Sequence, residues 1–150
     1  MLDYIEDMFI ESGILLNALL LGVMISFIVV TSPTVFKTLD KEHSKNFLRF
    51  IFPRLFNFCF LISTLMFLLF ALAEFSFGMV VGIAISISFL INTYFLTPRI
   101  NKMRDLMLTG HVESEKQFKK LHFASVILYL LSILFIVSIF AVYYYRLFSL

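Results

Sequence analysis

Long apolar stretches alternate with short charged ones along the chain. Four stretches hold no Lys, Arg, Asp or Glu, and each is about as long as an α-helix that crosses a hydrocarbon core of ~30 Å. This pattern predicts an all-α integral membrane protein with four transmembrane helices. The expected helices cover roughly residues 12–36, 54–73, 76–98 and 119–146.

The connections between these helices are short, so consecutive helices are expected to run antiparallel in an up-down bundle. Hydrophobic residues make up 61% of the 150 residues, against roughly half in a soluble domain. The mean hydropathy is +0.98. Little of the chain is left for a soluble part, and residues 1–150 are therefore expected to form one four-helix transmembrane domain.

The basic residues occupy two of the connections. Every Lys and Arg except Arg146 lies in residues 37–54 or 99–120, whereas residues 1–11 are acidic. Basic connections stay on the cytoplasmic side, so both termini are expected outside. The acidic start differs from the basic start of a secretory signal, so the first helix should be retained. We expect a multi-pass protein of a bacterial-type inner (plasma) membrane.

The first basic connection has two interpretations. The aromatic and aliphatic residues around Arg49 are typical of a short helix that lies in the headgroup zone. Alternatively, this stretch is an early start of the second transmembrane helix, broken at Pro53. The second connection contains Gly110 and alternating charges, so it is expected to be solvated.

Two further patterns concern how the helices pack. Gly78 and Gly82 form a G-x-x-x-G spacing, which lets helices approach closely, either within the chain or in a dimer. Pro33 and Pro98 both end an apolar stretch, and a lysine follows each at the same distance. These echoes fit either two repeated hairpins related by an axis along the membrane normal or chance similarity.

Polar residues near the cytoplasmic ends of the helices form the candidate binding site. Polar groups are costly in hydrocarbon unless they are paired, so they indicate either helix-to-helix hydrogen bonds or a site. The arginines can bind lipid phosphates, or they can reach to the interface and fix the orientation. We expect one connected polar network where the second, third and fourth helices meet. Its members are Asn57, Asn92, Arg99, Asn101, Arg104, Asp105, His122 and Ser125.

No motif of a soluble enzyme is present. The chain lacks a glycine-rich phosphate loop, paired carboxylates within the membrane and a nucleophile elbow. We therefore assign no catalytic residue, and we expect no resident cofactor or metal. The orientation rule already accounts for the basic connections, so nucleic-acid binding is not expected. Cys59 is the single cysteine, which excludes an internal disulfide.

Two other functions stay open. A haem-binding membrane oxidoreductase of the protoporphyrinogen oxidase type would need His122 as the axial ligand of haem b, and no second histidine lies within the membrane. A small transporter or metal-handling membrane subunit would use some of the seven methionines, whose simpler role is to fill gaps in packing. So small a bundle has little interior for a solute path. It is therefore expected to form a homo-oligomer in the lipid bilayer or to work with a partner membrane subunit.

The second half of the chain carries a resemblance to a known family. The residues that carry it are Asn92, Thr97, Pro98, Arg99, Ile100, Asn101, Arg104 and Asp105, followed by Phe118, Leu121, His122, Ser125 and Val126. In the first half, the same pattern is fitted by Gly22, Pro33, Phe36, Phe52 and Pro53. The chain resembles the transmembrane protein 205-like family, small four-helix membrane proteins that in bacteria are often labelled only as a domain of unknown function. The resemblance implies a four-helix membrane fold and no established activity.

Overall fold

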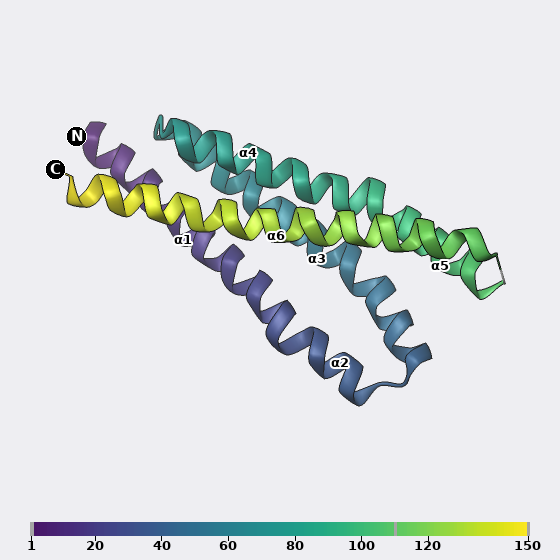
Figure 1. Ribbon diagram of the computed structural model, residues 1–150. Coiled ribbons are helices and arrows are strands. Elements are labelled where there is room, and N and C mark those ends of the chain that lie inside the picture. Colours follow the sequence, from purple (N-terminus) through teal and green to yellow (C-terminus); the bar gives the residue numbers. More distant parts are fainter. Residues whose placement is uncertain (1, 110, 150) are drawn as a thin grey trace.

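In the described part of the chain, four long helical rods follow one another and are joined by short connections (Figure 1). The computed structural model describes residues 2–109 and 111–149, and every regular element within these ranges is a helix. Two of the rods contain a short π-helical segment, labelled η, between two α-helical parts. The elements are α1 (Leu2–Ser26), η1 (Phe27–Thr31), α2 (Ser32–Thr38), α3 (Lys41–Leu72), α4 (Ser76–Ile91), η2 (Asn92–Leu96), α5 (Thr97–Leu108) and α6 (Val112–Phe148).

The rods form an up-down bundle in which both chain ends lie at the same end of the molecule (Figure 1). α1 packs against α3 and α6, and α4 packs against the same two helices. Within residues 2–109 and 111–149, four helices are long and apolar enough to cross a membrane, as a multi-pass membrane protein requires. They cover Tyr4–Thr38, Lys41–Leu72, Ser76–Met107 and Glu113–Phe148. The structure confirms the all-α, four-helix architecture that the sequence predicts.

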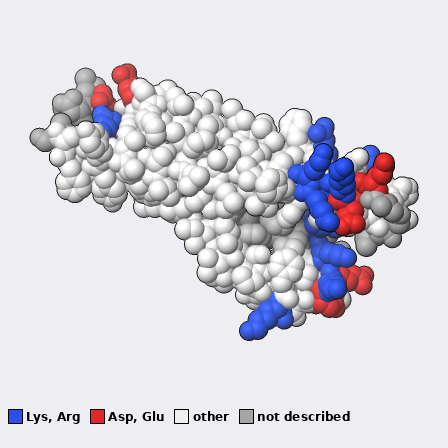
Figure 2. All heavy atoms as spheres, viewed as in Figure 1, with Lys and Arg blue, Asp and Glu red and all other residues white. Residues whose placement is uncertain are grey.

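The surface between the two ends of the bundle is apolar. Figure 2 shows Lys, Arg, Asp and Glu gathered at the two ends, with an uncharged band between them on the visible face. Large apolar side chains are well exposed, such as Leu15 at 72%, Val80 at 67% and Leu134 at 63%. A continuous surface of this kind is stable in hydrocarbon and prone to aggregate in water. The interior is apolar as well, with Leu20 and Phe89 fully buried.

The helices extend beyond the ranges expected from the sequence. α3 begins at Lys41 and passes through Pro53 without interruption. The first basic connection is therefore an early start of the second transmembrane helix, and the break expected at Pro53 is wrong. The extension is anchored because Leu48 is buried in one apolar cluster with Phe27 and Val35 of the first rod.

The outer ends of the other rods are helical as well. α1 begins at Leu2 rather than near residue 12, which adds an acidic helical extension before the apolar stretch. α5 continues to Leu108 and α6 begins at Val112, so most of the second basic connection is helix. Gly110, where the sequence predicts a solvated connection, lies outside the described residues.

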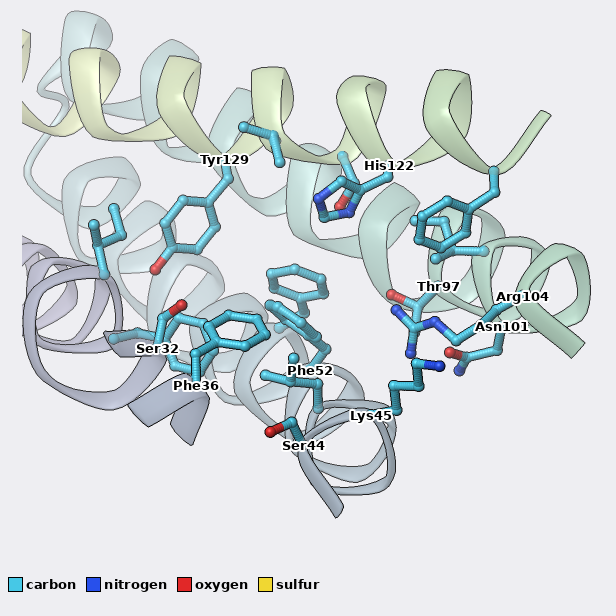
Figure 3. A pocket seen from close by; sticks show the side chains of 18 of the residues that line it. Ser32, Phe36, Ser44, Lys45, Phe52, Thr97, Asn101, Arg104, His122 and Tyr129 are labelled. Carbon is cyan, nitrogen blue, oxygen red and sulfur yellow. The ribbon is translucent and has the colours of Figure 1, made fainter. Parts of the chain in front are cut away.

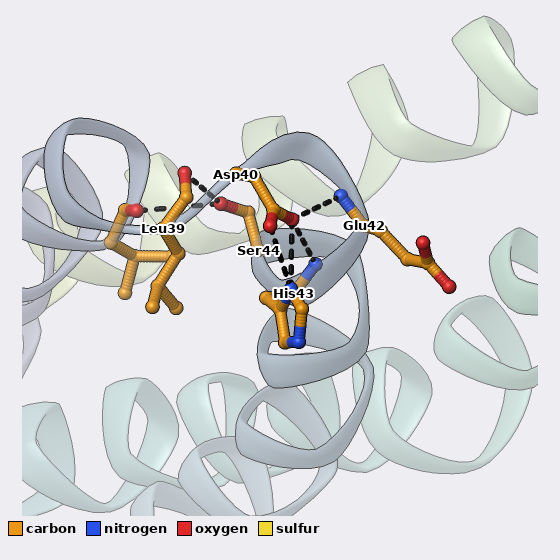
Figure 4. A network of polar contacts seen from close by, with 6 residues as sticks. Leu39, Asp40, Glu42, His43 and Ser44 are labelled. Atoms are coloured by element: carbon orange, nitrogen blue, oxygen red, sulfur yellow. Dashed lines mark hydrogen bonds and ion pairs between the residues drawn. The ribbon is translucent and has the colours of Figure 1, made fainter.

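A hydrogen-bonded corner joins α2 to α3 (Figure 4). The Asp40 carboxylate caps α3 by accepting hydrogen bonds from the backbone N–H groups of Glu42, at 3.0 Å, and His43, at 2.9 Å. The Ser44 hydroxyl donates to the backbone carbonyl of Leu39 at 3.1 Å. Hydrogen bonds from the backbone and the ring of His43 hold the pKa of Asp40 below its usual value. The corner therefore holds α2 close to the start of α3.

Each π-helical segment ends two residues before a proline. Pro33 and Pro98 stand in the first turns of α2 and α5, two residues after the ends of η1 and η2. In a regular α-helix, a proline ring clashes with the carbonyl group four residues earlier and cannot donate a hydrogen bond. The wider π turn relieves this clash, and in η1 the N–H of Ser32 reaches back to the carbonyl of Phe27. The two π-helical segments lie at the same distance before Pro33 and Pro98, and this equivalence fits a repeat of two hairpins.

The glycines of α4 face α3 within the same chain. A Cβ atom at Gly82 would lie 3.2 Å from the Cα of Phe67, and one at Gly78 would lie 2.7 Å from the Cδ2 of Phe70. Both glycines are buried. The G-x-x-x-G spacing therefore serves close packing of α3 on α4 inside the bundle.

Candidate binding site

At the basic end of the bundle, α2 and α6 diverge. α2 packs against α3 and α5 packs against α6, whereas the described residues of α2 make no contact with α6. The space between α2 and α6 is a pocket of about 640 Å³ (Figure 3). Pockets that hold small organic molecules measure roughly 300–1,000 Å³, so this one is large enough for a ligand.

Aromatic side chains from the first, second and fourth rods line one part of the pocket. The rings of Phe27 and Phe52 lie 5.2 Å apart, and those of Phe56 and Tyr129 lie 6.1 Å apart. The Tyr129 hydroxyl already donates to the backbone carbonyl of Met24 at 2.9 Å. This part of the pocket therefore favours apolar groups.

Polar and basic side chains line the other part of the pocket. Figure 3 places Lys45, Asn101 and Arg104 at one end, with Phe36 and Phe52 farther along. Among the described residues that line the pocket, three are Lys or Arg and none is Asp or Glu. The pocket is thus amphipathic, with an aromatic part and a positively charged end.

An aromatic ring holds the guanidinium group of Arg104 in place. The Cζ of Arg104 lies 5.4 Å from the centroid of the Phe118 ring, within the range of cation–π attraction. The His122 ring stacks on Phe118, with centroids 5.8 Å apart and 3° between the planes. Arg104 is partly buried, and its side chain has no ion pair with the described Asp and Glu residues. The group is therefore oriented in advance of any ligand.

Four of the eight expected site residues line this pocket: Asn101, Arg104, His122 and Ser125. A fifth, Asn92, is bonded to one of them, because the Ser125 hydroxyl donates to the Asn92 Oδ1 at 2.6 Å. Both residues are buried, and the Nδ2 of Asn92 has no hydrogen-bond partner in the described part of the chain. The structure thus brings five expected residues to one region, where η2, α5 and α6 meet.

The other three expected residues lie outside the pocket. Asn57 is exposed, and its Oδ1 accepts a hydrogen bond from the Tyr94 hydroxyl at 3.3 Å. Asp105 forms a two-pronged ion pair with Arg49, at 3.0 and 2.7 Å. Arg99 is exposed. Hydrogen bonds between described residues therefore join one pair of the eight expected members directly, and the polar groups fall into separate sets.

The wall that the first two rods supply was not expected from the sequence. Phe36, Lys45 and Phe52 belong to it. In the sequence Lys45 is one of many markers of orientation, and the phenylalanines look like ordinary membrane residues. The signals that were available are Pro33, which alters the end of the first rod, and Asp40, a helix-capping residue that turns the chain back sharply.

The three histidines lie in separate places. His122 lines the pocket. His43 is bonded to Asp40 in the α2–α3 corner, and His111 lies before α6. Within residues 2–109 and 111–149, no group of three His, Cys, Asp or Glu side chains could hold a metal ion. The positions of the histidines therefore add no support for an axial haem ligand or for a metal-handling site.

Comparison with known proteins gives a family but no activity. No curated protein and no solved structure matches the chain. A family model described as "Domain of unknown function (DUF4149)" matches residues 15–109. This range takes in both π-helical segments and the corner capped by Asp40, and it ends before α6. Because the match covers more than half of the chain, the protein belongs to the DUF4149 family, whose function is unknown.

Proposed function

We propose that the protein is a multi-pass protein of a bacterial-type inner membrane that binds an amphiphilic molecule between α2 and α6. The basic end lies in the cytoplasm in this proposal, and both termini lie outside, because basic connections resist translocation. The pocket then stands at the level of the cytoplasmic leaflet. A molecule of the bilayer can reach it by sideways movement.

The amphipathic lining of the pocket is the observation that carries the proposal. Apolar side chains at its margins are exposed on both helices, with Ile28 at 42% and Phe36 at 63% on the first rod, and Val126 at 39% and Leu130 at 45% on α6. In a membrane, these margins face acyl chains. Lipid as well as water can therefore enter the pocket between the first rod and α6. This access suits a ligand with an apolar part.

A narrower family relationship than DUF4149 is compatible with this proposal. The run from Asn92 to Val126 resembles the transmembrane protein 205-like family, and we propose that the chain is a bacterial relative of that group. Several residues of the run line the pocket, among them Asn101, Arg104 and His122. The resemblance names no ligand, so the chemistry of the pocket has to identify one.

A single-tryptophan variant tests the proposal. The chain contains no Trp, so Phe36→Trp places one fluorophore in the pocket lining. Leu134→Trp is the matched control, because Leu134 is also 63% exposed but lies on α6 outside the pocket lining. Each purified variant is titrated in detergent micelles with phospholipid that carries brominated acyl chains, which quench tryptophan on contact.

The expected result is saturable quenching of the Phe36→Trp variant at low ratios of lipid to protein. Unbrominated lipid of the same type should reverse it. The Leu134→Trp variant should show only the gradual quenching that follows from the lipid content of the micelle. Equal and unsaturable quenching of both variants would overturn the proposed site.

A further inference from the structure

We infer that the ligand is an anionic phospholipid whose phosphate group is held by Arg104 and Lys45. This inference rests on the proposed function, because it assigns the head group of the amphiphile that the pocket binds. It comes from the balance of charge in the pocket, from the support of Arg104 and from the order of polar and apolar groups along the lining.

The charge of the pocket is unbalanced. Elsewhere at this end of the bundle, two of the basic side chains pair with acids of the chain: Arg49 pairs with Asp105, and Lys119 pairs with Glu115 at 2.6 Å. The described lining of the pocket contains three Lys and Arg residues and no Asp or Glu, and the carboxylate nearest in sequence to Arg104, that of Asp105, is paired with Arg49. Like charges that share a partly apolar space repel one another, and an anion relieves that repulsion while gaining attraction of its own.

Arg104 has the geometry of an anion-binding group. A guanidinium presents a planar fork of N–H donors that fits two oxygens of one phosphate. The Phe118 ring beside Arg104 limits the positions that this fork can take. Less conformational freedom is then lost on binding, which favours affinity. Partial burial of Arg104 also strengthens the attraction relative to a fully exposed arginine.

The order of groups along the pocket matches a phospholipid. Figure 3 places the ammonium group of Lys45 and the amide of Asn101 at the same end of the pocket as Arg104. These groups can donate hydrogen bonds to further phosphate oxygens. The aromatic side chains Phe36 and Phe52 lie farther along, where acyl chains would pass. Two cations and an amide supply more donors than a single carboxylate accepts, so we assign a phosphate rather than a fatty acid.

The same cations could also serve to fix the orientation of the chain in the membrane. This role and phosphate binding predict different effects of substitutions. Fixing orientation needs positive charge anywhere in the connection. Binding a phosphate needs it at Arg104. Arg99 provides the matched control, because it carries the same group on the same helix, is exposed and does not line the pocket.

The test uses the Phe36→Trp variant and brominated lipids that differ only in the head group. Phosphatidylglycerol should bind most tightly, phosphatidylcholine more weakly because its own cation offsets the phosphate, and diacylglycerol least. Arg104→Gln should weaken phosphatidylglycerol binding about tenfold to a hundredfold, the loss expected for hydrogen bonds to a charged group. Arg99→Gln should change it by less than about threefold, because exposed charges are screened. Thiol labelling of the buried Cys59 checks that each variant remains folded.

The outcomes separate this inference from the proposed function. Saturable quenching with equal affinity for all three lipids, or with no effect of Arg104→Gln, would overturn the phosphate assignment and leave the amphiphile site standing. A brominated fatty acid that binds more tightly than phosphatidylglycerol would also overturn it. Absence of saturable quenching with every lipid would overturn the proposed site, and the head-group assignment with it.

Discussion

Phe70 fills the space that two glycines leave between three helices. Its side chain is fully buried, and its ring meets that of Phe75 edge-on, with centroids 5.2 Å apart. A Cβ atom at Gly78 would lie 2.7 Å from the Phe70 Cδ2 and 2.5 Å from the Phe75 Cδ1. A Cβ atom at Gly13 would press on the Phe70 ring from α1. We therefore predict that Gly78→Ala destabilises the bundle, because the added methyl group would press on the rings of Phe70 and Phe75.

The magnitude follows from the overlap. Carbon atoms in contact settle ~3.5–4.0 Å apart, so the added methyl group requires a shift of about 1 Å where rings have little room. Overpacking of this kind costs about 1–3 kcal/mol, and Ala in place of Gly in a helix returns about 1 kcal/mol. Gly22→Ala is the matched control, because a Cβ atom there would meet nothing within 4 Å. Both variants share the helix gain, so the difference between them isolates the contact at about 1–3 kcal/mol.

Cys59 supplies the assay, because it is the single cysteine and is fully buried. A thiol-reactive dye in detergent solution labels it when the bundle opens, so the midpoint temperature of labelling reports stability. For a chain of this length, 1 kcal/mol corresponds to about 2–4 °C. The midpoint of Gly78→Ala should therefore lie about 2–12 °C below that of Gly22→Ala.

A second substitution tests the cause of the loss. Phe70→Leu removes ring atoms, so Gly78→Ala should cost less in that background, with a coupling of roughly 0.5–3 kcal/mol. Equal midpoints for Gly78→Ala and Gly22→Ala would refute the reasoning. So would a cost of Gly78→Ala that Phe70→Leu leaves unchanged.

Hydrogen bonds and chain orientation lead to three more expected outcomes. Ser125→Ala leaves the buried Oδ1 of Asn92 without its donor, so the thiol assay should show a loss of about 1–3 kcal/mol. Ser132→Ala removes a bond within one helix and should cost less. Asp40→Ala should lower the midpoint more than Asp40→Asn, since asparagine still caps a helix. Because the pKa of Asp40 is lowered in the folded chain, the part of its stabilising effect that comes from the ionised carboxylate is present at neutral pH and is lost as the pH falls below about 4. The difference in thermal stability between wild type and Asp40→Ala should therefore shrink in acid toward the difference between Asp40→Asn and Asp40→Ala, and a difference that stays the same at every pH would contradict a cap by the ionised carboxylate. A reporter that works only in the cytoplasm should stay silent at the C-terminus, and a strong signal there would reverse the orientation.

The transmembrane helices could be predicted because charge excludes a segment from hydrocarbon whatever its neighbours are. The ends of the helices could not, because a helix does not stop where the membrane stops. The stretch that begins at Lys41 carries charges and is helical all the same, since Asp40 caps it and Leu48 anchors it against the first rod. A hydropathy profile measures only the length of an apolar stretch. It does not register helix capping by Asp40 or the packing of Leu48.

Only the wall of the pocket that α5 and α6 supply could be predicted from the sequence. Asn101, Arg104 and His122 were expected together because they lie near helix ends on the same side of the membrane, and the structure brings them to one pocket. The partner of Asp105 could not be predicted. Any basic side chain at that end satisfies the same rule of charge, and only the packing of α3 against α5 selects Arg49, which is 56 residues away.

The π-helical segments change how positions along the first and third rods should be counted. A single π turn acts like one inserted residue, and one residue in an α-helix corresponds to a rotation of about 100°. A helical wheel drawn straight through Tyr4–Thr38 therefore puts Phe36 on the wrong side, and the count has to restart at Ser32 and again at Thr97. Deleting one of residues 29–31, none of which lines the pocket, would swing Phe36 away from the pocket although every lining residue is still present in the sequence. Register, rather than composition, then decides which side chains of these rods meet a ligand and which meet lipid.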